Sequence, residues 1–172
     1  MLYHFSEDPT LTSFEPRAPI ERPDVEPMVW AIDEWHAPMY YFPRDCPRAC
    51  FWPSLRTTAE DRERWFGHVD AKMVIAVESA WLKRIRATAL YRYSMPPGSF
   101  VRLDETAGHW GSRETVTPLA FEPVGDLLDA LVAADIELRI TPSLAELWQR
   151  VISTTLACSA TRLRNAGLAP ST

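Results

Sequence analysis

The stretch "VWAIDEWHAPMYYFPRDCPRACFWP", residues 29–53, combines aromatic rings, arginines, two cysteines and four prolines in a short space. An apolar run at 28–32 predicts a strand that ends at Asp33. Pro38 suits the first turn of a short helix over 38–42, where its missing N–H breaks no hydrogen bond. We interpret residues 29–53 as a strand that leads into a rigid platform of aromatic and arginine side chains.

Outside this stretch, short strands and helices follow one another without a regular repeat. Apolar runs between turn signals predict strands, and helical spacing with capping residues predicts helices. The predicted strands cover 1–5, 72–78, 88–95, 99–103 and 114–121, with turns at 96–98 and 105–112, and the predicted helices begin near 59 and cover 124–135 and 143–167. This order favours an α+β fold with a mixed, largely antiparallel sheet core and C-terminal helices.

The composition is that of one globular domain. The chain has 172 residues, of which 47% are hydrophobic and 24% charged, so we predict a single domain over residues 1–172. Nine of the fifteen prolines lie in the first 53 residues, and residues 15–27 are predicted to be a Pro-rich surface loop. The net charge of -5 disfavours general nucleic-acid binding.

The sequence also indicates a compartment. No apolar run has the length of a membrane span, and the acidic N-terminus does not resemble a signal peptide. Three cysteines, an odd number, suit a cytoplasmic protein better than a secreted one. Cys46 and Cys50 are separated by three residues, which matches neither a structural zinc motif nor a redox dithiol. We therefore predict a cytoplasmic protein without a bound metal.

Because the sequence contains no strong catalytic signature, candidate site residues are chosen by their chemistry. His4 lies in the apolar first strand, where an unpaired histidine would be costly to bury. It either bonds to a backbone carbonyl as a core residue or donates a hydrogen bond to a ligand hydroxyl or phosphate.

The platform supplies a second group of candidates. Tyr40 and Tyr41 follow the second strand, and Arg44 and Arg48 come within eight residues of them. Aromatic faces and guanidinium groups together suit a planar anionic ligand such as a nucleotide. The alternative is that the arginines pair with nearby acidic residues such as Asp45 and that the aromatic rings belong to the core.

A third candidate region is "AGHWGSRETVTP", residues 107–118. Glycines on both sides of His109 and Trp110 allow a close approach of the backbone. Glu114 is predicted to stand at the start of the following strand, where a carboxylate can orient a ribose hydroxyl or stabilise an oxocarbenium ion. A solvated glutamate at a strand edge is the alternative.

The tail "RLRNAG", residues 162–167, is explained as the end of the last predicted helix. Its arginines complement the helix dipole and its glycine terminates the helix.

With these motifs in view, the sequence resembles a bacterial family of small proteins that share a domain of unknown function. Its members begin like "LYHFSEDP", continue with "VWAIDEWHAPMYYFPRDCPR", and carry "YRYSMP", "AGHWGSRETVTP" and "RLRNA". This resemblance covers nearly the whole chain and implies no activity.

A second resemblance is to the ADP-ribosyltransferase superfamily. An opening strand with "YH", a strand leading into a tyrosine-bearing helix, and a later glutamate at the start of a strand are similar to its His-Tyr-Glu arrangement. The resemblance implies NAD as the ligand, with His4 holding ribose hydroxyls, Tyr40 or Tyr41 stacking on the nicotinamide, and Glu114 as the catalytic carboxylate. RNA 2'-phosphotransferases share that fold and use NAD to remove a phosphate.

Three hypotheses for the function follow. The first is an NAD-using enzyme that transfers or hydrolyses ADP-ribose through His4 and Glu114. The second is a non-catalytic nucleotide-binding module. The third, a metal hydrolase, is disfavoured because its potential ligands lack a metal-type spacing. The aromatic and arginine patch of the second hypothesis consists of Arg44, Arg48, Trp52 and Arg92, and the potential metal ligands of the third are His4, His36, Cys46 and His109.

Overall fold

A computed structural model describes residues 1–18, 25–168 and 170. The chain forms two compact units, each made of two segments. The first unit contains Met1–Tyr40 and Ala89–Val124, and the second contains Tyr41–Thr88 and Gly125–Thr172. The single domain expected over the whole chain stays a prediction. Part of the expected Pro-rich loop, residues 19–24, lies outside the described residues.

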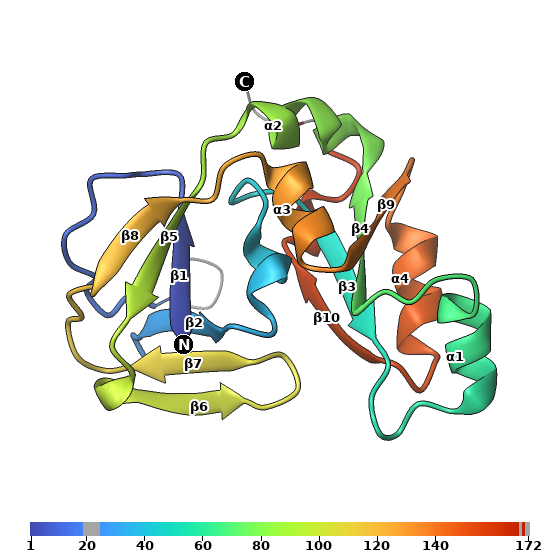
Figure 1. Cartoon of the computed structure of the whole chain (residues 1–172), viewed down its shortest axis with the longest axis horizontal. Coiled ribbons are helices and arrows are strands. Elements are labelled where there is room, and N and C mark those ends of the chain that lie inside the picture. Colours follow the sequence, from blue (N-terminus) through green and yellow to red (C-terminus); the bar gives the residue numbers. More distant parts are fainter. Residues whose placement is uncertain (19–24, 169, 171–172) are drawn as a thin grey trace. The chain divides into compact units, whose positions relative to one another are not determined.

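The first unit is built on a six-stranded sheet with the order β6-β7-β2-β1-β5-β8, in which β1 lies between β2 and β5 (Figure 1). All neighbouring strands are antiparallel. The strands are β1 (Leu2–Ser6), β2 (Val29–Asp33), β5 (Tyr91–Met95), β6 (Phe100–Asp104), β7 (His109–Ser112) and β8 (Ala120–Pro123), with the short 3-10 helices η1 (Ala37–Tyr40) and η3 (Pro97–Ser99). One face of the sheet carries a core that includes Leu2, Val29, Ala31 and Tyr93.

The second unit is built on a four-stranded sheet with the order β10-β3-β4-β9. Its first three strands are antiparallel, and β9 lies parallel to β4. The elements are β3 (Arg48–Trp52), α1 (Ala59–Phe66), β4 (Met73–Glu78), η2 (Ser79–Trp81), α2 (Leu82–Ala87), α3 (Leu127–Ala133), β9 (Ile136–Thr141), α4 (Ala145–Ile152), β10 (Ala157–Thr161) and η4 (Leu163–Asn165). Every residue of β3 and β4 is buried.

The predicted fold class is therefore confirmed: the chain is α+β, with two sheets whose strands are mostly antiparallel. The predicted helix start near Ala59 is also confirmed, since the Thr58 side chain accepts a hydrogen bond from the Asp61 N–H and caps α1. Among the described residues, none of the helices has the length and apolar character needed to cross a membrane.

The continuous helix predicted over 143–167 is wrong. Helix α4 ends at Ile152, and the chain then forms β10 beside β3. The cause is local, because the hydroxyls of Ser153 and Thr154 donate to the carbonyls of Arg150 and Val151 and so compete with continued helical bonding.

Two other expectations need correction. The segment 105–112 was expected to be a turn, but its second half is β7, a strand paired on both sides. The segment 114–121 was expected to be a strand, but β8 begins only at Ala120. In addition, β3 and β9 were not predicted, because the prolines around β3 resemble loop signals and β9 contains charged residues.

Candidate functional site

His4 lies where two central strands separate. The β1–β2 pairing comprises Leu2 with Asp33 and Tyr3 with Ile32. At the next position, the Nδ1–H of His4 donates to the carbonyl of Trp30 at 2.8 Å. The His4 ring also lies 4.7 Å from the ring of Phe14 in the core. This is the backbone-bonded arrangement that was one of the two alternatives for His4, and its role toward a ligand stays a prediction.

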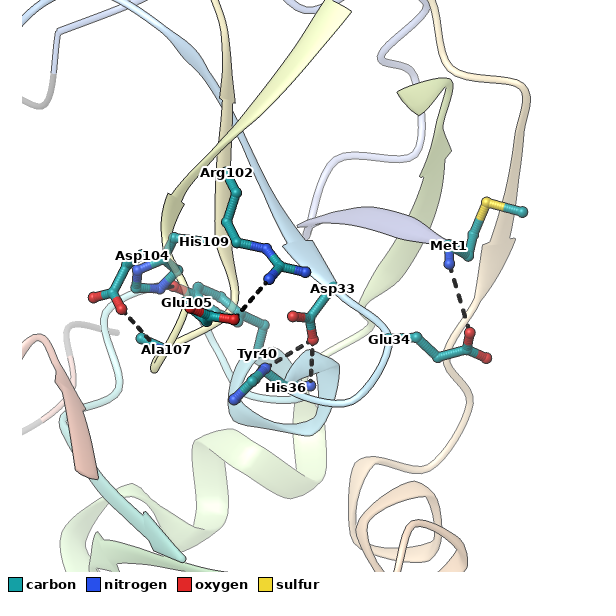
Figure 2. A network of polar contacts seen from close by, with 10 residues as sticks. All are labelled: Met1, Asp33, Glu34, His36, Tyr40, Arg102, Asp104, Glu105, Ala107 and His109. Carbon is teal, nitrogen blue, oxygen red and sulfur yellow. Dashed lines mark hydrogen bonds and ion pairs between the residues drawn. The ribbon is translucent and has the colours of Figure 1, made fainter. Parts of the chain in front are cut away.

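Asp33 and His36 form a hydrogen-bonded pair at the end of β2 (Figure 2). Asp33 Oδ1 accepts from the backbone N–H of His36 at 3.0 Å and from its ring Nδ1 at 2.8 Å. The ring of Trp35, which is 40% exposed, meets the buried His36 ring edge-on at 4.5 Å. The carboxylate therefore fixes the proton of His36 on Nδ1.

Tyr40 and His109 form a second pair. The hydroxyl of Tyr40, the last residue of η1, shares a 3.0 Å hydrogen bond with Nε2 of His109, the first residue of β7. Burial lowers the pKa of His109 below its ordinary value, and the neighbouring Asp104 carboxylate opposes this shift. His109 is therefore neutral at pH 7.

Gly108 brings the two pairs together. Its φ is +69°, a conformation that favours glycine, and its carbonyl accepts from the Asp33 N–H at 3.0 Å. A Cβ at this position would lie 2.2 Å from His36 Nδ1 and 2.6 Å from Asp33 Oδ2. We call Asp33, His36, Tyr40, Gly108 and His109 the histidine cluster. The close backbone approach predicted from the glycines is confirmed here.

Aromatic rings surround the histidine cluster. The rings of Phe5 and Tyr40 are parallel to within 9°, with centroids 6.4 Å apart. The Trp30 ring meets His109 edge-on at 6.4 Å. Asp33 was not predicted as a site residue, and His36 was considered only as a metal ligand, although the spacing Asp-x-x-His after a strand is a signal that could have identified the pair.

The other predicted residues of the first unit are not members of this cluster. Glu114 is exposed in a bend after β7. The prediction that it starts a strand is wrong, since β8 begins six residues later. Trp110 packs against the core of the first unit, with the Arg102 guanidinium 5.0 Å from its ring centroid. Arg92 bonds to Glu122 at 2.6 Å and lies over the Tyr3 ring.

The platform residues Tyr41, Arg44 and Arg48 belong to the second unit. Arg48 is only 2% exposed, and its guanidinium donates to the Cys46 carbonyl at 2.8 Å. Arg44 is exposed, and Tyr41 is half-buried. The guanidinium of Arg48 is thus placed inside the sheet core.

The tail of the chain also differs from the expected helix end. Arg162 adopts a left-handed conformation and donates to the Arg44 carbonyl, and Asn165 donates to the Asp45 carbonyl at 2.7 Å. These polar side chains tie the tail to the loop before β3 and do not end a long helix.

Neither a metal centre nor a reactive thiol emerges from the described residues. No group of three or more His, Cys, Asp or Glu side chains among them could hold a metal ion. Burial raises the pKa of both Cys46 and Cys50 to about 12, so these thiols are protonated at neutral pH.

Comparison with known proteins gives a family but no activity. No curated protein and no solved structure matches the chain significantly. A family model matches residues 3–166, almost the whole chain. The resemblance to a family with a domain of unknown function is thereby confirmed, and the comparisons add no support for the one to ADP-ribosyltransferases. The chain belongs to a family of unknown function (DUF6886).

Proposed function

We propose that the first unit binds a nucleotide of the NAD type, with the nicotinamide ring placed against Phe5 and Tyr40. The observation that carries the proposal is the parallel arrangement of these two rings beside the histidine cluster. Their centroids lie 6.4 Å apart, within the range of offset-stacked rings, so the nicotinamide would extend an existing stack. Transfer or hydrolysis of ADP-ribose is the reaction proposed for this ligand.

The charges near these rings suit a cationic ring better than a phosphate. Asp33 belongs to the histidine cluster, and Asp104 lies opposite His109 in the β6–β7 register. Arg102 is paired with Glu105 at 3.1 Å. The nicotinamide of oxidised NAD carries a positive charge, which nearby carboxylates stabilise, whereas they repel a phosphate.

The second candidate function is ligand binding without turnover. It is favoured by the exposed position of Glu114, the predicted catalytic carboxylate, in the bend after β7. His4 lies on the other face of β1 from Phe5, against Phe14, so a role of His4 toward a ligand is not part of this ring stack.

The test is calorimetric titration of the protein with NAD, ADP-ribose and a 2'-phosphorylated dinucleotide. Tyr40→Ala is expected to weaken NAD binding about tenfold, or roughly 1.4 kcal/mol, and to change ADP-ribose binding much less. His4→Ala, on the other face of β1, should change both affinities much less than Tyr40→Ala changes the affinity for NAD. Phe121→Ala, which removes an exposed aromatic ring from β8 of the same unit, is the matched control.

Two outcomes separate the candidates, and two others would contradict the proposal. Release of nicotinamide by the wild-type protein supports the enzyme, and NAD binding without release supports the binding module. No binding of any of the three ligands, or equal losses in Tyr40→Ala and Phe121→Ala, would contradict the proposal.

A further inference from the structure

His109 is held in place by the sheet. It begins β7, pairs with Ile32 on β2 and faces Asp104 on β6. Tyr40 is the last residue of the short helix η1. The backbone of a strand residue paired on both sides is held more rigidly than the last residue of a short helix. His109 therefore orients the Tyr40 hydroxyl.

The hydrogen bond between them requires one proton and one lone pair. A neutral imidazole has one protonated nitrogen and one acceptor nitrogen. If Tyr40 donates to Nε2, the proton of His109 must lie on Nδ1. Burial lowers the pKa of His109, and the negative charge of Asp104 across the β6–β7 pair opposes this shift, so the neutral ring can act as an acceptor of a further proton.

We propose that Tyr40 and His109 form a proton relay, in which the Tyr40 hydroxyl donates to Nε2 of His109 and contacts the attacking nucleophile. This inference rests on the proposed function. The water oxygen bonds to C1' of the ribose, and the C1'–N bond breaks with its electron pair going to the nicotinamide nitrogen. A water proton passes to Tyr40 while the Tyr40 proton passes to His109. Tyr40 is the catalytic residue, and His109 is a positioning residue that acts through it.

The relay is tested first without ligand, by long-range proton–nitrogen NMR of protein with 15N-labelled histidine. Replacing each of the four histidines by glutamine in turn assigns the signals. The relay predicts that Nε2 of His109 carries no proton and that its nitrogen shift moves in Tyr40→Phe. His68→Gln, on an exposed histidine of the second unit, should leave the His109 signals unchanged. A protonated Nε2, or signals unaffected by Tyr40→Phe, would overturn the relay.

Ligand experiments distinguish this inference from the proposed function. A wild-type protein that binds no NAD refutes the proposed function, while the NMR result still decides the direction of the Tyr40–His109 bond. If nicotinamide is released, His109→Gln should slow release about 100-fold, change NAD affinity less than threefold and remove the decline of the rate at acidic pH. Release with an unchanged rate and pH profile in His109→Gln would overturn the relay.

Discussion

The two units differ in the polar contacts of their side chains. In the second unit, buried side chains bond to backbone: Arg48 donates to the Cys46 carbonyl, and Glu78 accepts from the N–H groups of Leu144 and Gly167. In the first unit, His4 and Tyr93 also bond to backbone carbonyls, but the half-buried Tyr40 and His109 bond to each other. Side chains that bond to backbone hold loops and helix ends in place. Pairs of titratable side chains whose protonation state is set by their partners are typical of sites that act on a ligand.

The largest expected effect concerns the second unit. Glu78→Ala removes a buried carboxylate and leaves the N–H groups of the buried Leu144 and the exposed Gly167 without this acceptor, so we expect a loss of about 3 kcal/mol in the free energy of unfolding. Urea unfolding followed by tryptophan fluorescence measures it. Glu63→Ala, on the exposed face of α1, should cost less than about 0.5 kcal/mol. A small loss in Glu78→Ala would refute the architectural role of this carboxylate.

Gly108→Ala tests the close contact within the histidine cluster. The alanine would have to adopt a positive φ, and its Cβ would overlap His36 and Asp33. We therefore expect a loss of about 2 kcal/mol in the free energy of unfolding. The matched control is Gly125→Ala, since Gly125 has a φ of +84° but open space around its Cβ position. Backbone strain alone should cost that variant about 1 kcal/mol. Equal losses in the two variants would show that the cluster tolerates a larger residue.

The smallest expected effect is a pH dependence in the first unit. Because the pKa of His109 is lowered by burial from its ordinary 6.5, the unfolded chain binds this proton more tightly than the folded one. The stabilisation is fully present above pH 6.5 and is lost as the pH falls through the lowered pKa. The unfolding free energy should therefore decrease between pH 7.5 and 5.5, and less steeply in His109→Gln. The control His68→Gln should leave the pH dependence of the unfolding free energy unchanged. The same result in His109→Gln would contradict the assignment of this pH dependence to His109.

Most local elements of the fold could be predicted from the sequence, but several pairings could not. The capped start of α1 and the apolar run of β4 were recognised because their signals are local. β3 was missed, since prolines flank it and its burial depends on β4 and β10, which are distant in sequence. The helix predicted from residue 143 begins at Ala145, where the Ser143 hydroxyl accepts from the Ala145 N–H and the distant Glu78 carboxylate accepts from the Leu144 N–H.

The same distinction applies to the candidate site. The sequence by itself identified His4, Tyr40 and the glycines around His109 as unusual, because each residue type is costly or conformationally special in its local context. It also determined the α+β class, through the spacing of apolar residues. Only the tertiary structure decided that Tyr40 meets His109 and that Arg48 lies in the core. Hydrogen-bond partners that are 69 residues apart are set by strand pairing, and no local pattern encodes that pairing.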